Sequence, residues 1–486
     1  MEKIRRPEQY ALDRLATLLG PKGYQDDPEQ IAPWLTDWRG VYHGNARALL
    51  APSCVAEVQA IVATAGEFGI GIVPQGGNTS MVGGATPSAD GSTMLVSLRR
   101  MNKIRQIDSV AGYAVAEAGV ILSVLHDAAN SVEWRFPLSL GAKGSATIGG
   151  LVSTNAGGTQ VLRFGTMRKL VLGLEAVLPD GALFTSLAAL KKDNRGYDLS
   201  QLLIGAEGTL GVVTAATLRL VPKICDRVVA WIGVDSPQDA LTMMRMMERA
   251  TGDAIESFEI MPAETLALVL KHIPGSRNPL AGDHPWHVLI EYVVTTPRDQ
   301  SADALFAPIV AAQIDAGMAR DAVLSANEAQ ADAFWRLRDS ISEAERANGP
   351  AMQHDISVPI NAMPAFMIDV AAAVERRFPG VIASAFGHLG DGNVHFHVRA
   401  PAGADPVSWR NTTGNAASQF VYDQVTAAGG SLSAEHGIGQ MKRDELVRQS
   451  DPGRLAAMRA IKHALDPANI MNPGKLVPLA SGKPSP

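Results

Sequence analysis

Glycine is concentrated in three stretches of this chain, and this constrains the fold more than any other feature of the sequence. The first runs from Pro74 to Gly84, the second from Pro137 to Gly158, and the third from Ile204 to Val213. Glycine lets the backbone approach a ligand closely because it has no Cβ. Three such loops in one segment are hard to explain as turns, so we expect them to hold a long, flat, anionic ligand.

The first glycine loop has the composition of a phosphate-binding turn. Successive backbone N–H groups in a tight turn form a concave anion site, and Thr79 and Ser80 add hydroxyl donors. The loop lacks the Gly-Lys-Ser/Thr ending of a P-loop and the G-x-G-x-x-G spacing of a Rossmann site. Taken alone, it is equally well explained as a glycine-rich surface turn.

The chain has 486 residues, enough for two or three domains. A β-α-β pattern with glycine loops extends to about residue 225, strands and helices alternate without such loops to about 425, and helical segments dominate the end. We therefore expect an α+β protein with a domain that carries the glycine loops over 1–225, a second α+β domain over 226–425, and a mainly helical C-terminal segment over 426–486. One long helix is expected over 327–347.

Composition excludes several classes of protein. Apolar residues make up 46% and charged residues 19% of the chain, and the net charge of −6 gives no basic surface for nucleic acid. No apolar run reaches the ~18–20 residues that span a bilayer. Two cysteines, Cys54 and Cys225, form no disulfide framework. Since no secretory signal is visible at the start, the default expectation is a cytoplasmic location.

Three of the 11 histidines fall within ten residues, at His388, His395 and His397. Strand-like runs flank Gly390-Asp391-Gly392, so we expect a hairpin that brings His388 near His395. Later in the chain, Glu435 and His436 stand side by side. Two imidazoles and one carboxylate suit Zn²⁺, and Mn²⁺ is an alternative. A single histidine is more often structural, so the metal site is predicted from the set.

Arg338 and Ser342 are four residues apart in the expected long helix, beside an apolar stripe. An arginine fork with a hydroxyl one turn away suits a carboxylate. The alternative is a solvated arginine paired with Asp339 or Glu343.

The glycine loops resemble those in the FAD-binding domain of the vanillyl-alcohol-oxidase/p-cresol-methylhydroxylase superfamily. The resemblance to this superfamily covers essentially the whole chain. This resemblance implies an FAD-binding domain over 1–225, a ferredoxin-like α+β cap domain over 226–425 that binds the substrate, and a helical C-terminal segment over 426–486 that packs back on the FAD site. Covalent members often have a histidine after the Gly-Gly pair; Asn78 stands there, which implies non-covalent FAD. The residues implied to bind FAD are Pro74, Gly76, Gly77, Asn78, Thr79, Ser80, Gly83, Pro137, Leu138, Gly141, Ser145, Thr147, Gly149, Gly150, Ser153, Asn155, Gly157, Glu207, Gly211, Val212 and Asn472.

The run Gly-His-Leu-Gly-Asp-Gly-Asn-Val-His, followed by Glu-His-Gly-Ile-Gly, resembles the D-lactate, glycolate and D-2-hydroxyglutarate dehydrogenase group. Leu389 favours the D-2-hydroxyglutarate branch. The resemblance implies His388, His395 and Glu435 as metal ligands and His436 as the catalytic base. It also implies that Arg338 and Ser342 bind the substrate.

Two residues depart from that branch. Gln353 replaces a lysine expected to grip the second carboxylate of 2-hydroxyglutarate, and His397 replaces an asparagine. Gln353 donates a hydrogen bond but has no charge. This departure disfavours a dicarboxylic substrate such as 2-hydroxyglutarate and favours a lactate-like or malate-like acid.

The implied reaction oxidises a small D-2-hydroxy acid by hydride transfer to flavin N5, with metal-assisted activation of the hydroxyl and His436 as base. An electron-transfer flavoprotein or quinone is the expected acceptor, and a homodimer the expected assembly. Two alternatives remain: a metal-free FAD alcohol or aldonolactone oxidase of the same superfamily, and an FAD-binding subunit of a multi-chain glycolate oxidase. A metal-binding structural protein would leave the glycine loops unexplained.

Overall fold

The computed structural model describes residues 8–478, which divide into two compact units. Unit 1 holds residues 8–157, 165–222 and 435–478, and unit 2 holds 158–164 and 223–434. Each unit contains both helices and strands, so the expected α+β class is confirmed. The functional division at residues 225 and 425 stays a prediction.

Unit 1 contains a four-stranded sheet, in the order β1-β2-β4-β3, and a five-stranded antiparallel sheet, in the order β5-β6-β10-β8-β9. Strand β4 pairs in parallel with both β2 and β3. The elements of this unit are α1 Gln9–Gly23, β1 Tyr24–Gln25, α2 Pro28–Leu35, β2 Leu49–Leu50, α3 Val55–Phe68, β3 Gly71–Gln75, β4 Thr93–Ser97, β5 Ile104–Asp108, β6 Tyr113–Glu117, α4 Leu122–Asn130, β7 Trp134–Arg135, α5 Ile148–Thr154, α7 Met167–Leu170, β8 Val171–Val177, β9 Leu183–Ser186, α8 Leu199–Leu203, β10 Val212–Arg219, β11 Val221–Pro222, α17 Arg443–Gln449 and α18 Pro452–Leu465.

Helix α3 leads into the first glycine loop through β3. The N-cap residue of this helix is Cys54, which makes no side-chain cap bond. The backbone N–H of Ser53 instead donates to Glu57 at 2.6 Å. The helix ends at Phe68, and its C-cap is Gly69, whose φ of +63° suits glycine.

Unit 2 is built on a seven-stranded antiparallel sheet in the order β15-β12-β14-β13-β17-β18-β16. Its elements are α6 Val161–Phe164, β12 Asp226–Val234, α9 Pro237–Thr251, β13 Ile255–Pro262, α10 Ala263–His272, β14 Trp286–Val294, α11 Ala302–Asp315, β15 Asp321–Leu324, α12 Glu328–Asp339, α13 Ile341–Asn348, β16 Ala351–Ser357, α14 Met363–Arg377, β17 Ile382–His388, β18 Asn393–Arg399, α15 Pro406–Trp409 and α16 Asn415–Ala427.

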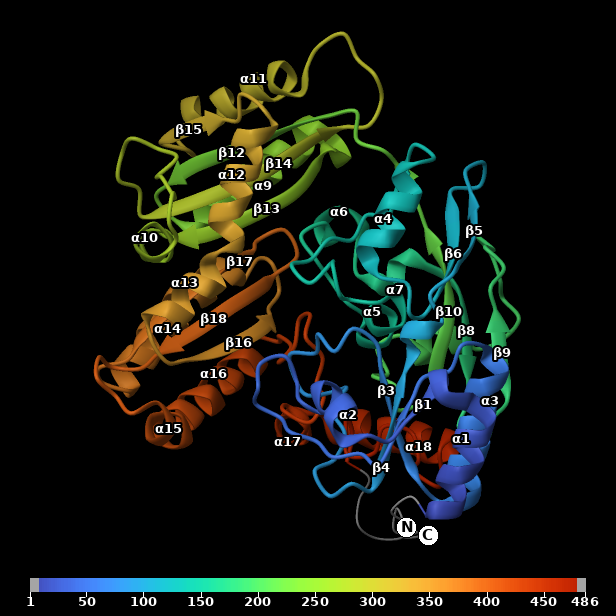
Figure 1. The fold of residues 1–486 in the computed structure, drawn as a ribbon. Helices are drawn as coiled ribbons and strands as arrows, with labels where there is room; N and C mark the ends of the chain where they lie inside the picture. The colour runs from blue at the N-terminus through green and yellow to red at the C-terminus, as the bar shows by residue number, and fades with distance from the viewer. Residues whose placement is uncertain (1–7, 479–486) are drawn as a thin grey trace. The chain divides into compact units, whose positions relative to one another are not determined.

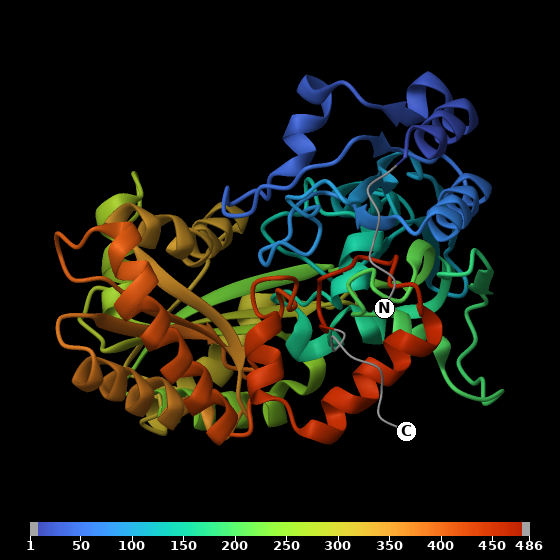
Figure 2. The ribbon, with the colours of Figure 1, turned by 90° about the horizontal axis from the view of Figure 1, so that it is seen from below.

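The two faces of this sheet bury different helices (Figures 1 and 2). Helices α9, α11, α14 and α16 share one apolar core with the sheet, and α10, α12 and α13 share another. Side chains alternate between faces along a strand. In β18, Val394, Phe396 and Val398 join the first core, so His395 and His397 point to the face that carries α10, α12 and α13.

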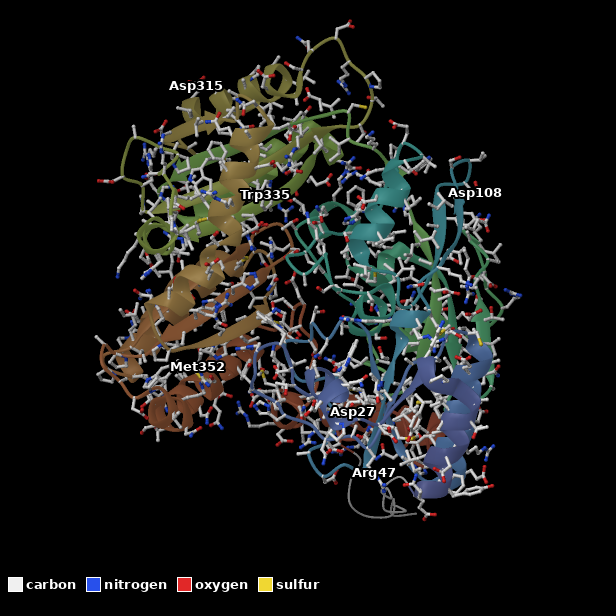
Figure 3. The ribbon with its side chains drawn as sticks, in the orientation of Figure 1. Asp27, Arg47, Asp108, Asp315, Trp335 and Met352 are labelled. Carbon is white, nitrogen blue, oxygen red and sulfur yellow. The ribbon has the colours of Figure 1, made fainter. Side chains whose placement is uncertain are left out.

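The expected continuous helix over 327–347 is wrong: α12 and α13 are separated at Ser340, where ψ is −3°. Serine weakens a helix because its hydroxyl competes for backbone hydrogen bonds. Arg338 therefore lies in the last turn of α12, and Ser342 in the first turn of α13. Trp335, labelled on α12 in Figure 3, holds that helix to β14 by donating its indole N–H to Glu291 at 2.6 Å.

Candidate active site

The first two glycine loops pack against each other in unit 1. A Cβ added at Gly76 would clash with the hydroxyl of Thr147, and one added at Gly77 would clash with the carbonyl oxygen of Ser145. Gly149 has the same constraint against Ala118. Only glycine allows such close contacts, because it has no Cβ.

Unusual backbone angles coincide with residues predicted to bind FAD. Asn78, Asn155, Glu207 and Asn472 have φ angles of 55°, 50°, 52° and 41°. Residues other than glycine adopt such angles rarely, and clusters of them are typical of ligand sites. The side chain of Asn78 is fixed by donating to the carbonyl of Thr36 at 2.9 Å.

The third glycine loop and the C-terminal segment meet at Glu207. Its buried carboxylate accepts the backbone N–H groups of Ile438 and Gly439, both at 2.7 Å. Burial raises the pKa of Glu207, and these two hydrogen bonds oppose that rise. Asn472 donates to the carbonyls of Gly84 and Glu207 at 3.0 and 2.7 Å. Asn472 thus ties the C-terminal segment to the first and third glycine loops.

These residues of unit 1 fit an FAD. Thr147 Oγ1 and Asn472 Oδ1 are buried and have no hydrogen-bond partner within residues 8–478, as expected of groups that meet a polar ligand. The other predicted FAD residues also lie in unit 1: Pro74, Thr79, Ser80, Gly83, Pro137, Leu138, Gly141, Gly150, Ser153, Gly157, Gly211 and Val212.

Gly77→Ala should weaken FAD binding, because the new Cβ forces the two loops apart. Overpacking of this kind costs about 1–3 kcal/mol, which corresponds to about 5- to 150-fold in the Kd of FAD. The flavin absorbance retained after purification and a titration of the apoprotein measure the effect. Gly144→Ala is the control, since nothing lies within 4 Å of its added Cβ; equal FAD affinity in both variants would contradict the packing argument.

The histidine hairpin forms as the sequence predicts. Strands β17 and β18 pair in antiparallel fashion around the turn after His388, and the ring centroids of His388 and His395 lie 5.3 Å apart. The side chain of His388 is 8% exposed and that of His395 is 15% exposed. Gly392, with φ of +82°, makes the turn possible.

Each of these histidines has a carboxylate on the Nδ1 side of its ring. The Nδ1–H of His388 donates to Glu259 at 2.6 Å, and Nδ1 of His395 lies 4.0 Å from Asp355. Although burial raises the pKa of Glu259, the charges of Arg338 and His388 lower it to about 2. Sequence reasoning missed Glu259, which lies on β13, far along the chain from the hairpin and in no motif. The register of β13 against β17 places it beside His388.

Arg338 reaches the same carboxylate. Its Nε donates to Glu259 at 2.9 Å, and its Nη2 lies 3.1 Å from Nε2 of His388. The structure therefore brings Arg338 to the histidines. The exposed Ser342 belongs to the next helix because of the break at Ser340.

Gln353 and His397 face each other across β16 and β18. Nδ1 of His397 is in close contact with a carboxylate oxygen of Glu345, on α13. Both side chains are buried, and the other oxygen of Glu345 has no hydrogen-bond partner within the described part of the chain. Glu345 is a second residue that the sequence analysis missed.

Glu435 and His436 begin the last segment of unit 1. Glu435 is joined by a peptide bond to Ala434, whose N–H donates to the carbonyl of Asp355 at 3.4 Å within unit 2. His388 and His395, in unit 2, offer two imidazole nitrogens, and Glu435, in unit 1, offers a carboxylate oxygen. This donor set suits Zn²⁺ or Mn²⁺.

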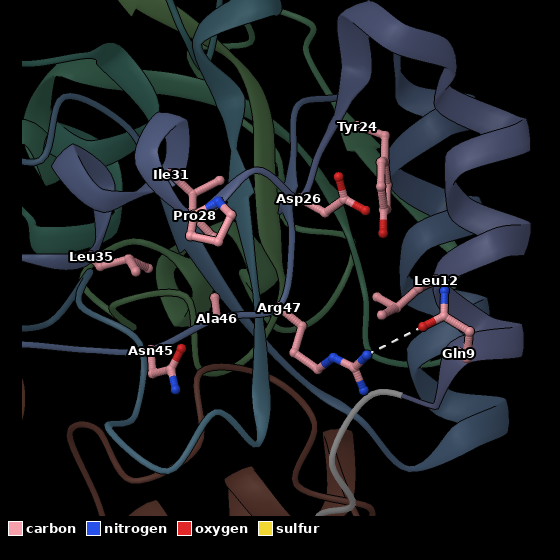
Figure 4. A pocket seen from close by; sticks show the side chains of 10 residues that line it. All are labelled: Gln9, Leu12, Tyr24, Asp26, Pro28, Ile31, Leu35, Asn45, Ala46 and Arg47. Atoms are coloured by element: carbon pink, nitrogen blue, oxygen red, sulfur yellow. Dashed lines mark hydrogen bonds between the residues drawn. The ribbon is translucent and has the colours of Figure 1, made fainter.

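A pocket of about 340 Å³ elsewhere in unit 1 is unrelated to these residues (Figure 4). Arg47 crosses it to donate to Gln9 at 3.2 Å. None of the predicted site residues lines it; the lining residues are Gln9, Leu12, Tyr24, Asp26, Pro28, Ile31, Leu35, Asn45, Ala46 and Arg47.

Comparison with known families identifies both parts of the chain. Residues 46–186 match the FAD binding domain family, and residues 225–476 match the C-terminal domain of FAD linked oxidases. The expected FAD cofactor and the expected resemblance are thereby confirmed.

Curated relatives extend over most of the chain. A mitochondrial D-2-hydroxyglutarate dehydrogenase of Bos taurus is 38% identical over 93% of this chain and 80% of its own length. That of Arabidopsis thaliana is 36% identical over 95% and 80%. A D-2-hydroxyglutarate dehydrogenase of Xanthomonas citri pv. viticola is 36% identical over 93% of both chains.

Solved structures share the fold at low identity. A p-cresol methylhydroxylase has a TM-score of 0.70 at 17% identity and covers 96% of both chains. An alkyldihydroxyacetonephosphate synthase has a TM-score of 0.71 at 15% identity, covering 97% of this chain and 87% of its own.

The expected cytoplasmic location is wrong. Relatives from Arabidopsis thaliana, Bos taurus and Rattus norvegicus are named mitochondrial, and the expectation rested only on the lack of a visible secretory signal. Among the described residues, no helix is long and apolar enough to cross a membrane.

Proposed function

The chain belongs to the FAD-linked oxidases that include the D-2-hydroxyglutarate dehydrogenases, and from this premise we propose that it oxidises its D-2-hydroxy acid with the help of a divalent metal. Its general activity is that of an FAD-dependent oxidoreductase acting on a small D-2-hydroxy acid. The observation that carries the metal proposal is the pair of adjacent imidazoles, with Glu259 hydrogen-bonded to Nδ1 of His388 and Asp355 lying 4.0 Å from Nδ1 of His395. Carboxylates commonly orient metal-binding histidines in this way.

The residues take distinct roles in this proposal. FAD, held by the glycine loops of unit 1, supplies the acceptor for the Cα hydride. A metal held by His388, His395 and Glu435 would supply a positive charge that lowers the pKa of the substrate hydroxyl. His436 removes the hydroxyl proton, since an imidazole titrates near neutral pH. Arg338 binds the substrate carboxylate and sets which face of Cα is presented.

The size of the acid depends on whether the site accepts a second carboxylate. The curated relatives are named for 2-hydroxyglutarate, but Gln353 gives this chain no charge for a second carboxylate. The buried carboxylate of Glu345 contacts His397, which faces Gln353 across the strands. The negative charge of Glu345 would repel a second substrate carboxylate placed near Gln353 and His397. We therefore favour a lactate-like or malate-like acid, with Gln353 and His397 setting the preference.

Gln353→Lys should raise kcat/KM for D-2-hydroxyglutarate relative to D-lactate. A charged hydrogen bond contributes about 1.5–3 kcal/mol, so the ratio should rise about 10- to 150-fold. Steady-state kinetics with both acids measure it. Gln353→Met, similar in length but uncharged, is the control; an equal change in both variants would show that charge is not the cause.

The remaining assignments follow from the resemblance. Electron-transfer flavoprotein or a quinone is the proposed acceptor, and a homodimer the proposed assembly. Residues 1–225 are proposed to bind FAD, 226–425 to bind substrate, and 426–486 to complete the flavin site. Ser342 is proposed to assist Arg338 at the substrate.

Turnover with an artificial electron acceptor tests the proposed function. D-Lactate, D-malate and D-2-hydroxyglutarate are compared with their L-forms, and the metal content of the same sample is measured. Turnover of a D-acid by protein that contains one metal per chain supports the proposal. Turnover restricted to alcohols or aldonolactones would contradict it.

A further inference from the structure

Glu259 connects two residues that the proposed reaction uses for different purposes. It is 1% exposed and lies directly opposite His388 in the pairing of β13 with β17. One of its oxygens accepts from Nδ1 of His388 and the other from Nε of Arg338. We infer that Glu259 is a positioning residue that fixes the metal-binding form of His388 and the orientation of Arg338; this inference rests on the proposed function.

The contacts of His388 specify one tautomer. A carboxylate can only accept, so the proton of the ring lies on Nδ1, which is 2.6 Å from Glu259. A guanidinium can only donate, so Nε2, which is 3.1 Å from Nη2 of Arg338, carries the lone pair. Nε2 is then the nitrogen able to bind a cation, and the carboxylate behind the ring increases its basicity.

The same carboxylate orients Arg338. Its bond to Nε holds the plane of the guanidinium and directs the terminal nitrogens toward the side of the histidines. Glu259 also places a negative charge beside the arginine and the metal ligand. That charge offsets the repulsion between a cation at His388 and the guanidinium of Arg338, which is strong in a buried setting.

Glu256 provides a matched control on the same strand. It is 0% exposed and pairs with Arg163 at 3.1 Å within unit 2. Neither Glu256 nor Arg163 is proposed to bind metal, FAD or substrate. Loss of a buried ion pair alone should therefore affect Glu256→Gln and Glu259→Gln alike.

The test uses full-length, FAD-loaded protein and Zn²⁺ in competition with a chelator. Glu259→Gln should bind Zn²⁺ about 10- to 100-fold more weakly than the wild type, while Glu256→Gln stays within about twofold; FAD content should match in all three. Equal Zn²⁺ affinity in Glu259→Gln and the wild type would overturn the inference. If the wild type takes up no Zn²⁺, the proposed metal site is overturned together with this inference. If the wild type binds Zn²⁺ and Glu259→Gln binds it equally well, only this inference is overturned.

A second measurement needs no Glu259 variant and so does not depend on how that variant folds. ¹⁵N-histidine NMR of the zinc-loaded wild type, with the His388 signals assigned from their loss in His388→Ala, identifies the coordinating nitrogen. The inference predicts coordination through Nε2 with a proton on Nδ1. Coordination through Nδ1 would overturn it.

Discussion

His436→Ala should abolish reduction of the flavin by substrate while FAD stays bound. A positioned general base contributes about 10²- to 10⁴-fold to a proton transfer, and no other residue in the proposal removes the hydroxyl proton. The backbone N–H groups of Ile438 and Gly439, in the loop that follows His436, hold Glu207, and neither hydrogen bond uses the His436 side chain, so we expect FAD to stay bound. Stopped-flow absorbance under anaerobic conditions measures the rate.

His463→Ala is the control for this variant. It removes an exposed histidine of α18 in the same unit, and its reduction rate should equal that of the wild type. A normal rate in His436→Ala would exclude His436 as the base. Loss of FAD from His436→Ala would instead show that the residue supports the flavin site.

Removal of the metal should lower substrate-driven flavin reduction by about 100-fold or more, since charge stabilisation by a metal is worth several kcal/mol. Dialysis against a chelator removes the ion, and the flavin spectrum shows whether FAD remains. Addition of Zn²⁺ or Mn²⁺ should restore the rate, and the more effective ion identifies the metal the site prefers.

Full activity in metal-free protein would contradict the metal proposal. It would favour the alternative of a metal-free alcohol or aldonolactone oxidase of the same superfamily. A parallel His395→Ala sample sharpens the test, because its rate should match that of chelated wild type and should not respond to added metal.

The sequence predicts features that depend on short-range patterns. Period-two alternation and the turn at Gly392 predict the hairpin of His388 and His395, because both signals lie within a few residues of each other. The interruption at Ser340 is not predicted from the sequence. The apolar stripe continues from α12 into α13, so the helical pattern of the sequence shows no break at Ser340.

The partners of the site residues could not be predicted from the sequence. Glu259 is 129 residues from His388 and meets it only through the pairing of β13 with β17. Glu345 meets His397 only because α13 lies over that face of the sheet. Such contacts depend on strand order and helix packing, which a single sequence does not specify. A buried acidic residue within an apolar strand, as at Glu259, is the one available signal.

Anaerobic mixing of the FAD- and metal-loaded protein with D-lactate, D-malate, D-2-hydroxyglutarate and their L-forms tests the central claim most directly. We predict that the flavin absorbance is bleached rapidly by a D-acid and by none of the L-acids, and that D-lactate or D-malate reacts faster than D-2-hydroxyglutarate. If no D-acid bleaches the flavin while FAD and metal are both present, the assignment of a D-2-hydroxy acid as substrate is contradicted.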